Sequence, residues 1–437
     1  MNDAALPAAP TAPSARRDFG LRRRHASEAR FRFYGVAAIL IGLAFLVVLL
    51  VSIVSKGYTA FVQTSITVPV EFSAEIIDKD NKRATDPRVL VSANYPVVAR
   101  NAVAKALGIS LDDKAAMRDI GKFVSDGSRA TLRQIVVSDP SVIGTTRPVT
   151  LLAAADIDSA NKGQIDLTVP EKSRKVSDRQ VQWLEQLRAQ GAISTPFNWG
   201  LLTFGASSRP ETSGLGVALL GSLYMMGIVL VCALPIGVAA SIYLEEFAKK
   251  NRFTDFIEVN INNLAAVPSI VFGLLGLAVF INFFGMPRSA PIVGGLVLTL
   301  MTLPTIIIAT RAALRSVPPS IRSAALGIGA SRMQMVFDHV LPLATPGILT
   351  GTIIGLARAL GETAPLLLIG MVAFVADYPS SPLDPATALP VQIYMWTNEA
   401  ERAFVERTSG AVIVLLVFLA LMNLLAILLR RRFERRW

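Results

Sequence analysis

Reactive and metal-binding side chains are scarce in this sequence of 437 residues. Its one cysteine, Cys232, cannot form a disulfide within the chain. The two histidines, His25 and His339, are far apart and have no cysteine partners, which excludes a zinc site built from the usual Cys and His ligands. No paired catalytic acids stand out, and residues 121–123 (Gly-Lys-Phe) do not complete a phosphate-binding Walker A loop. We therefore expect no catalytic residue, no metal and no cofactor bound by this chain.

Charged residues are also few, at 17% of the chain, whereas 52% of the residues are hydrophobic. Soluble domains carry about 25% charged residues, so this composition argues against a soluble enzyme and predicts a membrane protein with several spans. The net charge of +11 comes largely from two basic flanks. Arginines precede the first apolar tract and follow the last one, at positions 16, 17, 22, 23, 24, 30 and 32 and at positions 430, 431, 432, 435 and 436. Such flanks place both termini in the cytoplasm by the positive-inside rule, and without interleaved aromatics they do not indicate nucleic-acid binding.

Several apolar tracts are long enough to cross a bilayer, which takes about 20 residues of helix. Five carry no charge: 34–55, 212–244, 259–287, 289–310 and 408–429. The first is too long for a signal peptide and lacks a cleavage site, so we expect a retained anchor. A sixth tract, 342–376, contains Arg358 and Glu362; counting it as one helix gives the even number of spans that two cytoplasmic termini require. The predicted fold is therefore an all-α polytopic membrane protein with six transmembrane helices.

These spans predict the organisation of the whole chain. We expect a cytoplasmic Arg-rich tail (1–33), a first transmembrane helix (34–55), a periplasmic inserted domain (56–211), a core with five transmembrane helices (212–430) that includes an inner loop (311–341), and a basic cytoplasmic tail (431–437). Loop charges agree with this topology, because 311–341 has four arginines and one aspartate, whereas 377–407 has five acids and two arginines.

The insert 56–211 has the patterns of a small α+β domain. Residues 64–74 alternate like a strand, and Ser177 and Gln180 have the spacing of a capping box at the start of a helix. A second helix is predicted over 111–124. No metal or nucleophile pattern occurs in the insert, so a structural or docking role is favoured, and sensing is the alternative.

The tract 342–376 combines small residues with an ion pair. On a helical wheel, glycines at 347, 351 and 355 share one stripe with Arg358, Glu362 and Pro365. Glycines at this spacing let a neighbouring helix approach closely, so we assign Gly347, Gly351 and Gly355 to helix packing. A charge at the bilayer centre costs roughly 2.5–3.5 kcal/mol on insertion scales, so this stripe must face protein or a water-filled path.

Two interpretations of Arg358 and Glu362 remain open. They could form a structural ion pair, since residues four apart on a helix can contact each other. Alternatively, they form a polar gate or binding element on a transport path, which we favour because ionisable residues inside a membrane are functional by default. The planar fork of an arginine suits an oxyanion, since it binds two oxygens at once. The glutamate could hold the arginine until substrate arrives, or disfavour anions that bring no proton.

The inner loop contains a recognisable motif. Residues 321–331 (Ile-Arg-Ser-Ala-Ala-Leu-Gly-Ile-Gly-Ala-Ser), followed by Leu341-Pro342, resemble the EAA loop of ABC importer permeases. Ser323 stands where this motif usually has glutamate, and His339 where it has isoleucine. The resemblance implies that the loop carries a short coupling helix that rests in a groove of a partner ATPase. It assigns ATPase coupling to Ser323, Ala324, Ala325, Gly329 and Ala330.

Three further stretches narrow the family: residues 235–247, 263–274 and 358–365. Together they look like the PstA-type permease of the bacterial phosphate importer over residues 212–430, in a long-insert variant. The resemblance implies an ABC type I importer permease of the bacterial inner membrane that carries phosphate by alternating access. It also implies a PstC-type second permease, a PstB-type ATPase dimer that binds the ATP, and a periplasmic phosphate-binding protein. It places Arg358, Glu362 and Thr363 on the translocation path.

Other functions are weighed against this one. A permease for another oxyanion, molybdate or sulfate, would share the architecture. A membrane sensor could use the 56–211 domain to read a ligand, but the short cytoplasmic segments contain no output domain. An intramembrane enzyme lacks support, because no catalytic pattern is present.

Overall fold

The computed structural model describes residues 21–433, apart from residues 80, 82, 84 and 87. The predicted tails therefore lie partly outside the described residues, at 1–20 and 434–437. Contacts divide the chain into two compact units, residues 1–53 and 54–437. The first unit contains most of one helix, α1 (Leu21–Gly57), which includes the apolar tract 34–55.

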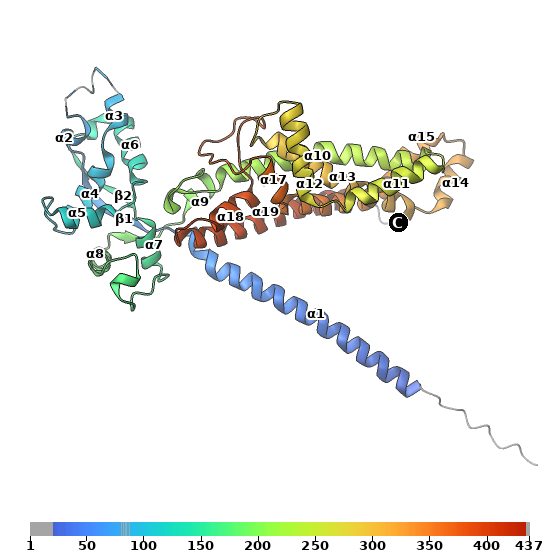
Figure 1. Cartoon of the computed structure of the whole chain (residues 1–437), viewed down its shortest axis with the longest axis horizontal. Helices are drawn as coiled ribbons and strands as arrows, with labels where there is room; N and C mark the ends of the chain where they lie inside the picture. Colours follow the sequence, from blue (N-terminus) through green and yellow to red (C-terminus); the bar gives the residue numbers. More distant parts are fainter. Residues whose placement is uncertain (1–20, 80, 82, 84, 87, 434–437) are drawn as a thin grey trace, which may run out of the picture. The chain divides into compact units, whose positions relative to one another are not determined.

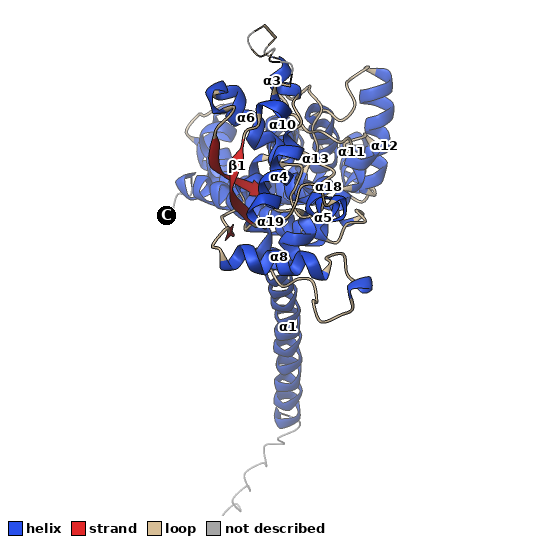
Figure 2. Cartoon of the chain, turned by 90° about the vertical axis from the view of Figure 1, so that its left-hand side faces the viewer, coloured by secondary structure: helices blue, strands red, loops and turns tan. Residues whose placement is uncertain are grey.

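A small antiparallel sheet lies within residues 65–194. Its central strand β1 (Ser65–Glu71) pairs with β2 (Thr146–Leu152) on one side and with the short β3 (Ile193–Ser194) on the other. Ile66, Val68 and Val70 of β1 are buried and alternate with exposed residues, which confirms the predicted strand pattern. Figure 2 shows this sheet in red among helices, with α4 (Tyr95–Ala106) packed on β1 and α6 (Ser128–Ser138) on β2.

Short helices complete this region. They are α2 (Ala74–Ile77), α3 (Arg88–Ser92), α5 (Lys114–Gly121), α7 (Ala155–Asn161), α8 (Asp178–Ala189) and α9 (Trp199–Thr203). The helix predicted over 111–124 is thus shorter, because Asp113 caps its N-terminus by accepting hydrogen bonds from two backbone amides. The predicted capping box starts α8: the Ser177 hydroxyl accepts from the Gln180 amide, and the Gln180 side chain accepts from the Ser177 amide.

The remainder of the second unit is a bundle of long apolar helices (Figure 1), which we call the C-terminal bundle, residues 216–433. It consists of α10 (Gly216–Ile242), α11 (Arg252–Ala265), α12 (Ser269–Gly276), α13 (Pro291–Ser316), α14 (Pro319–Gly327), α15 (Arg332–Gln334), α16 (Leu341–Gly361), α17 (Ala364–Leu368), α18 (Leu389–Thr397) and α19 (Ala403–Phe433). Three π-helical segments extend α10, α12 and α15, at Tyr243–Phe247, Leu277–Phe283 and Met335–Val340. α13 packs against α10 and α16, and α16 packs against α19.

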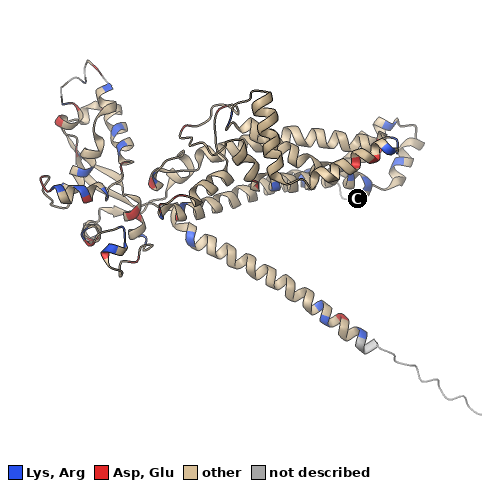
Figure 3. Ribbon diagram, in the orientation of Figure 1, with Lys and Arg blue, Asp and Glu red and all other residues tan. Residues whose placement is uncertain are grey.

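Five helices among the described residues are long and apolar enough to cross a membrane, or six if one bent pair counts as a single span. The long segments begin at α1, α10, α13, α15 and α19. Figure 3 shows few charged residues along the long helices of the bundle and a concentration of them around α14 and α15. The chain is therefore a multi-pass membrane protein, as its composition predicts.

The tract 259–287 is not the single helix that we predicted. α11 and the α12 segment meet at an angle of 99°, with the break at residues 266–268. Pro268 explains the break, because its nitrogen cannot donate to the helix and its ring disfavours helical geometry in the preceding residue.

The tract 342–376 is also not one helix, so that prediction is wrong. The helical segment starts earlier, at Arg332, and ends at Gly361. Glu362 is extended, with ψ of 128°, and only the short α17 follows before an irregular stretch. Pro365 accounts for the end of α16, because it has no N–H for the carbonyl of Gly361 and its ring would clash there.

A buried ionic junction links α7 to the start of α19. The Lys162 ammonium donates to Asp158 Oδ2 at 2.7 Å and to Glu406 Oε1 at 2.9 Å, and all three side chains are 5–6% exposed. The neighbouring Arg407 is also buried. Because buried charges are costly unless they are paired, this cluster fixes one position of α7 on α19.

Candidate functional site

Arg358 lies in the last turn of α16, and Glu362 directly follows the helix. Arg358 Nε is 3.9 Å from Glu362 Oε1, and the side chains are 50% and 22% exposed. In the described part of the chain, Arg358 has no other charged partner. The pair is therefore long and open on one side, which leaves most of the guanidinium fork free for a second partner.

Thr363 continues this site into the next element. It precedes α17, and its carbonyl accepts hydrogen bonds from the amides of Leu366 and Leu367. α17 packs tightly on α12. The close approach is visible at Gly273 of α12, where an added Cβ would lie only 2.7 Å from Pro365 Cα. The structure thus brings together two separated sequence motifs, 263–274 and 358–365, and together they position the segment that holds Glu362 and Thr363.

The three glycines of α16 face α13. An added Cβ would lie 2.6 Å from Ala313 Cβ at Gly347, 2.2 Å from Ala309 Cβ at Gly351, and 2.8 Å from Thr302 Cγ2 at Gly355. These distances are shorter than side-chain contacts allow, so only glycine permits this helix separation. Pro365 belongs to α17, and Arg358 is half exposed, so the glycines alone make the packing stripe.

The inner loop 311–341 is mostly helical and presents α14. This helix ends in a Schellman motif: Gly329 has φ of +92°, its amide donates to the Leu326 carbonyl, and the Ala330 amide donates to the Ala325 carbonyl. Glycine adopts this left-handed backbone without strain, which explains the sharp turn after the helix.

The predicted coupling residues, on α14 and in the turn that follows it, divide between an exposed and a buried side. Ser323, Ala324 and Gly329 are exposed, whereas Ala325 is buried and Ala330 is half-buried against the same apolar cluster. At the end of the helix, Ile328 is 82% exposed.

An ionic network that the sequence analysis missed holds α14 in place. The Arg322 guanidinium donates to Glu246 Oε1 at 2.7 Å and to the carbonyls of Leu314 and Val317 at 2.8 and 2.7 Å. Glu246 is 7% exposed and belongs to the π-helical end of α10. All three nitrogens of the Arg322 guanidinium thus donate hydrogen bonds that join α14 to α10 and α13.

Further arginines extend this network. Arg315 donates to Glu245 at 2.8 Å, and Arg311 bonds both Glu245 and Glu258 of α11. The sequence contained a signal for this cluster, since Glu245 and Glu246 directly follow an apolar tract and need cationic partners near the membrane. Sequence spacing alone could not identify the cationic partners of Glu245 and Glu246, which are 66 to 76 residues away.

Among the described residues, no group of three or more His, Cys, Asp or Glu side chains could hold a metal ion. The arrangement instead offers a guanidinium for anion contact at the end of α16, and an anchored helix, α14, for contact with another protein.

Comparisons with protein families match two parts of the chain. Residues 233–437 match the family described as binding-protein-dependent transport system inner membrane component. Residues 18–171 match a domain of unknown function, DUF3333. The second match covers α1 and much of the region that contains the sheet.

Curated relatives match the same C-terminal part. The phosphate transport system permease protein PstA 1 of Mycobacterium tuberculosis is 32% identical over 57% of this chain and 81% of that protein. The phosphate transport system permease protein PstA of Xylella fastidiosa is 33% identical over 51% of this chain and 77% of that protein. The probable ABC transporter permease protein YqgI of Bacillus subtilis is 37% identical over 38% of this chain, a match that spans 56% of that protein.

Solved structures include a similar chain of the MetNI methionine ABC transporter in an inward-facing conformation. It is 18% identical, with a TM-score of 0.42, and the match covers 50% of this chain and 97% of that chain.

Proposed function

Because this chain belongs to the PstA family of phosphate transport system permeases, we propose that it is the permease subunit of an ATP-driven importer that carries inorganic phosphate across the bacterial inner membrane. The observation that carries this proposal is the extended similarity to PstA permeases, which spans most of their length. Chains of this family are transport components, so ATP hydrolysis belongs to a partner subunit.

We propose a topology of six spans, in which the bent pair α11–α12 crosses as one. Both termini lie in the cytoplasm, and residues 56–211 form an α+β domain on the periplasmic side. The arginines next to α1 and at the end of α19 support this orientation through the positive-inside rule.

On the translocation path, Arg358, Glu362 and Thr363 receive the anion. Arg358 is half exposed in the isolated chain, and exposure of an arginine to lipid within a bilayer is energetically unfavourable. Its open side therefore faces a water-filled path shared with the second permease. There its guanidinium binds two phosphate oxygens, and the Glu362 carboxylate accepts a hydrogen bond from the phosphate hydroxyl and repels anions that carry no proton.

An importer permease of this kind works with an ATPase and a substrate-binding protein. More specifically, we assign a PstC-type second permease, a PstB-type ATPase dimer and a periplasmic phosphate-binding protein as partners. The exposed residues of α14, with Ile328 at its end, contact the ATPase. The ionic network around Arg322 then transmits the movement of the ATPase from α14 to α10.

Uptake of radiolabelled phosphate at micromolar concentration, in cells that lack this gene, tests the proposal. Expression of the wild-type chain should restore uptake, and excess molybdate or sulfate should not compete. Competition by either anion would instead assign the chain to that substrate. A failure to restore any uptake would contradict the transport function and leave the ligand of the periplasmic domain as the alternative.

A further inference from the structure

A pocket of about 350 Å³ lies where the region of the sheet meets the segments that lead into two long helices. We call it the seam pocket. Its wall includes Arg100 and Lys122 from the region that contains the sheet. Glu211, from the segment before α10, and Glu401, from the segment before α19, complete it. Pockets that hold small ligands begin at about 300 Å³, so this volume suits a compact organic molecule.

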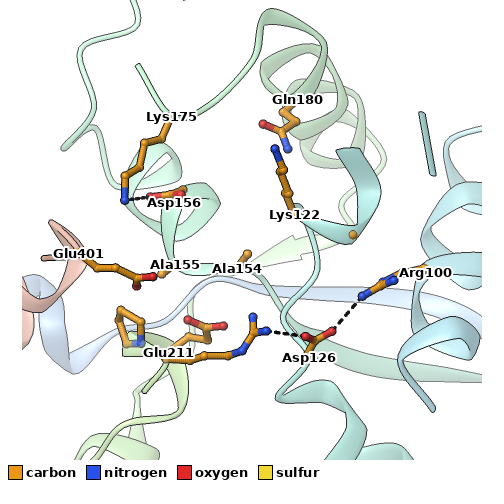
Figure 4. Close-up of a pocket in the computed structure, with 13 residues that line it drawn as sticks. Arg100, Lys122, Asp126, Ala154, Ala155, Asp156, Lys175, Gln180, Glu211 and Glu401 are labelled. Atoms are coloured by element: carbon orange, nitrogen blue, oxygen red, sulfur yellow. Dashed lines mark hydrogen bonds and ion pairs between the residues drawn. The ribbon is translucent and has the colours of Figure 1, made fainter. Parts of the chain in front are cut away.

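One side of the seam pocket is cationic (Figure 4). Arg100 and Arg209 both bond Asp126, at 3.2 and 2.6 Å, so these three side chains keep a net positive charge. Lys122 also lines the pocket and has no partner among the residues that the structure describes. Arg100 Nε is buried and makes no hydrogen bond, which leaves an unsatisfied donor in this wall. A bound oxyanion would pair with the exposed Lys122 ammonium.

The opposite side is acidic. Figure 4 shows Glu401, Glu211 and Asp156 across the cavity from Lys122 and Arg100. Glu211 is 4% exposed and accepts a hydrogen bond from the Ser125 hydroxyl at 2.6 Å. Glu401 has no partner within the described ranges, and Asp156 is only loosely paired, with Lys175 Nζ 3.9 Å from its carboxylate. Carboxylates in this position suit a cationic amine, which donates several hydrogen bonds.

The balance of charge in the wall narrows the choice of ligand further. The wall contains four cationic and four acidic side chains, so its net charge is zero. A simple anion or a metal cation would face repulsion from one wall, whereas a molecule with both charges would match each wall with its opposite. We propose that the seam pocket binds a small zwitterion, with its oxyanion at Lys122 and Arg100 and its amine at Glu401 and Glu211.

Because the ligand contacts both the inserted region and the segments before α10 and α19, its binding would stiffen this junction. Two sources share this chemistry: a free solute such as phosphoethanolamine, and the headgroup of phosphatidylethanolamine. This proposal does not depend on phosphate transport, since binding is measured on the purified chain without uptake.

Isothermal titration calorimetry on the full-length chain, in nanodiscs of phosphatidylglycerol, tests the proposal with phosphoethanolamine as the probe. We expect saturable binding with one site, and inorganic phosphate and ethanolamine should each bind at least tenfold more weakly. Replacing part of the lipid by phosphatidylethanolamine separates the sources: weaker binding of the probe assigns the site to the lipid headgroup, and unchanged binding assigns it to a free solute.

Variants of one residue on the cationic side and one on the acidic side of the seam pocket complete the test. Lys122→Ala and Glu401→Gln should each weaken binding at least tenfold, because each removes the partner of one ligand charge. Lys172→Ala and Glu185→Gln change exposed residues outside the pocket and should leave binding unchanged. Undetectable binding of phosphoethanolamine, or binding that neither Lys122→Ala nor Glu401→Gln weakens, would overturn the proposal. Both altered pocket residues are exposed, so the variants should fold, which equal thermal midpoints would verify.

Discussion

Individual side chains account for the proposed substrate. Arg358 has one long contact, to Glu362, and half of its side chain is exposed, an arrangement that a purely structural ion pair does not need. Its identity and spacing were readable from the sequence, because an arginine and a glutamate four residues apart interrupt an apolar tract. The sequence did not predict that Arg358 lies in the last turn of α16, since the end of this helix depends on Pro365 and on packing against α12.

We predict that Arg358→Ala lowers phosphate uptake at least tenfold without loss of membrane insertion or complex assembly, because the anion loses its main partner. Arg358→Lys should recover only part of the uptake, since an ammonium cannot bind two oxygens in a fixed fork. Uptake by cells and co-purification of the partner subunits measure the two effects. Arg402→Ala, which changes an exposed arginine, is the matched control. Near-normal uptake by Arg358→Ala would refute the role of this residue in anion binding.

The glycine stripe gives a second prediction at the residue scale. Gly351→Ala should lower the thermal midpoint of the purified chain, because its Cβ would lie 2.2 Å from Ala309 Cβ and force α16 away from α13. Overpacking of this kind costs about 1–3 kcal/mol. Gly227→Ala, in α10, places a Cβ in open space and should leave the midpoint nearly unchanged. Equal midpoints for the two variants would show that the α13–α16 packing tolerates a side chain.

At the scale of elements, the apolar tracts predicted which segments become long helices but not where they bend or end. Both errors occur at prolines, Pro268 and Pro365, whose effect depends on whether neighbouring helices can accommodate a break. Local signals were more reliable. The capping box at Ser177 depends on a few adjacent residues, so the sequence alone was sufficient to locate it.

The contact between Arg322 of α14 and Glu246 at the end of α10 gives a prediction at the scale of elements. Arg322→Gln should leave the ATPase bound but reduce the phosphate carried per ATP hydrolysed several-fold, because α14 would move without α10. Glu246→Gln should have a similar effect, and the double variant should be no worse than either single one, since both remove the same contact. Reconstituted importer, with ATP hydrolysis and uptake measured together, supplies the readout. Fully additive losses would mean that the two residues act separately.

For the whole molecule, the contacts that join distant parts were the least predictable. Lys162 and Glu406 are 244 residues apart, and the sequence suggested only that Glu406 was one of several acids in an outer loop. Their pairing depends on how the inserted region meets α19, which periodicity and local motifs do not encode. The inserted region is thereby tied to one of the long helices, so we expect it to move together with α19.

Lys162→Met should destabilise the chain strongly, because Asp158 and Glu406 stay buried but lose their hydrogen bonds to the Lys162 ammonium, and only the neighbouring Arg407 still offsets their charge. Removing one partner of a buried ion pair costs about 3–5 kcal/mol. Lys105→Met is the control, since its pair with Glu71 is half exposed and such surface pairs contribute about 0–1 kcal/mol. Thermal midpoints in detergent compare the two variants. Similar small shifts would contradict a buried, stabilising junction.

The most direct test of the central claim is uptake of labelled phosphate into proteoliposomes that contain this chain, its second permease and the ATPase, with the binding protein added outside. The proposed function predicts accumulation that requires ATP inside and binding protein outside, and that excess sulfate does not reduce. Phosphate entry without ATP, or no accumulation by a complex that assembles and hydrolyses ATP, would contradict it.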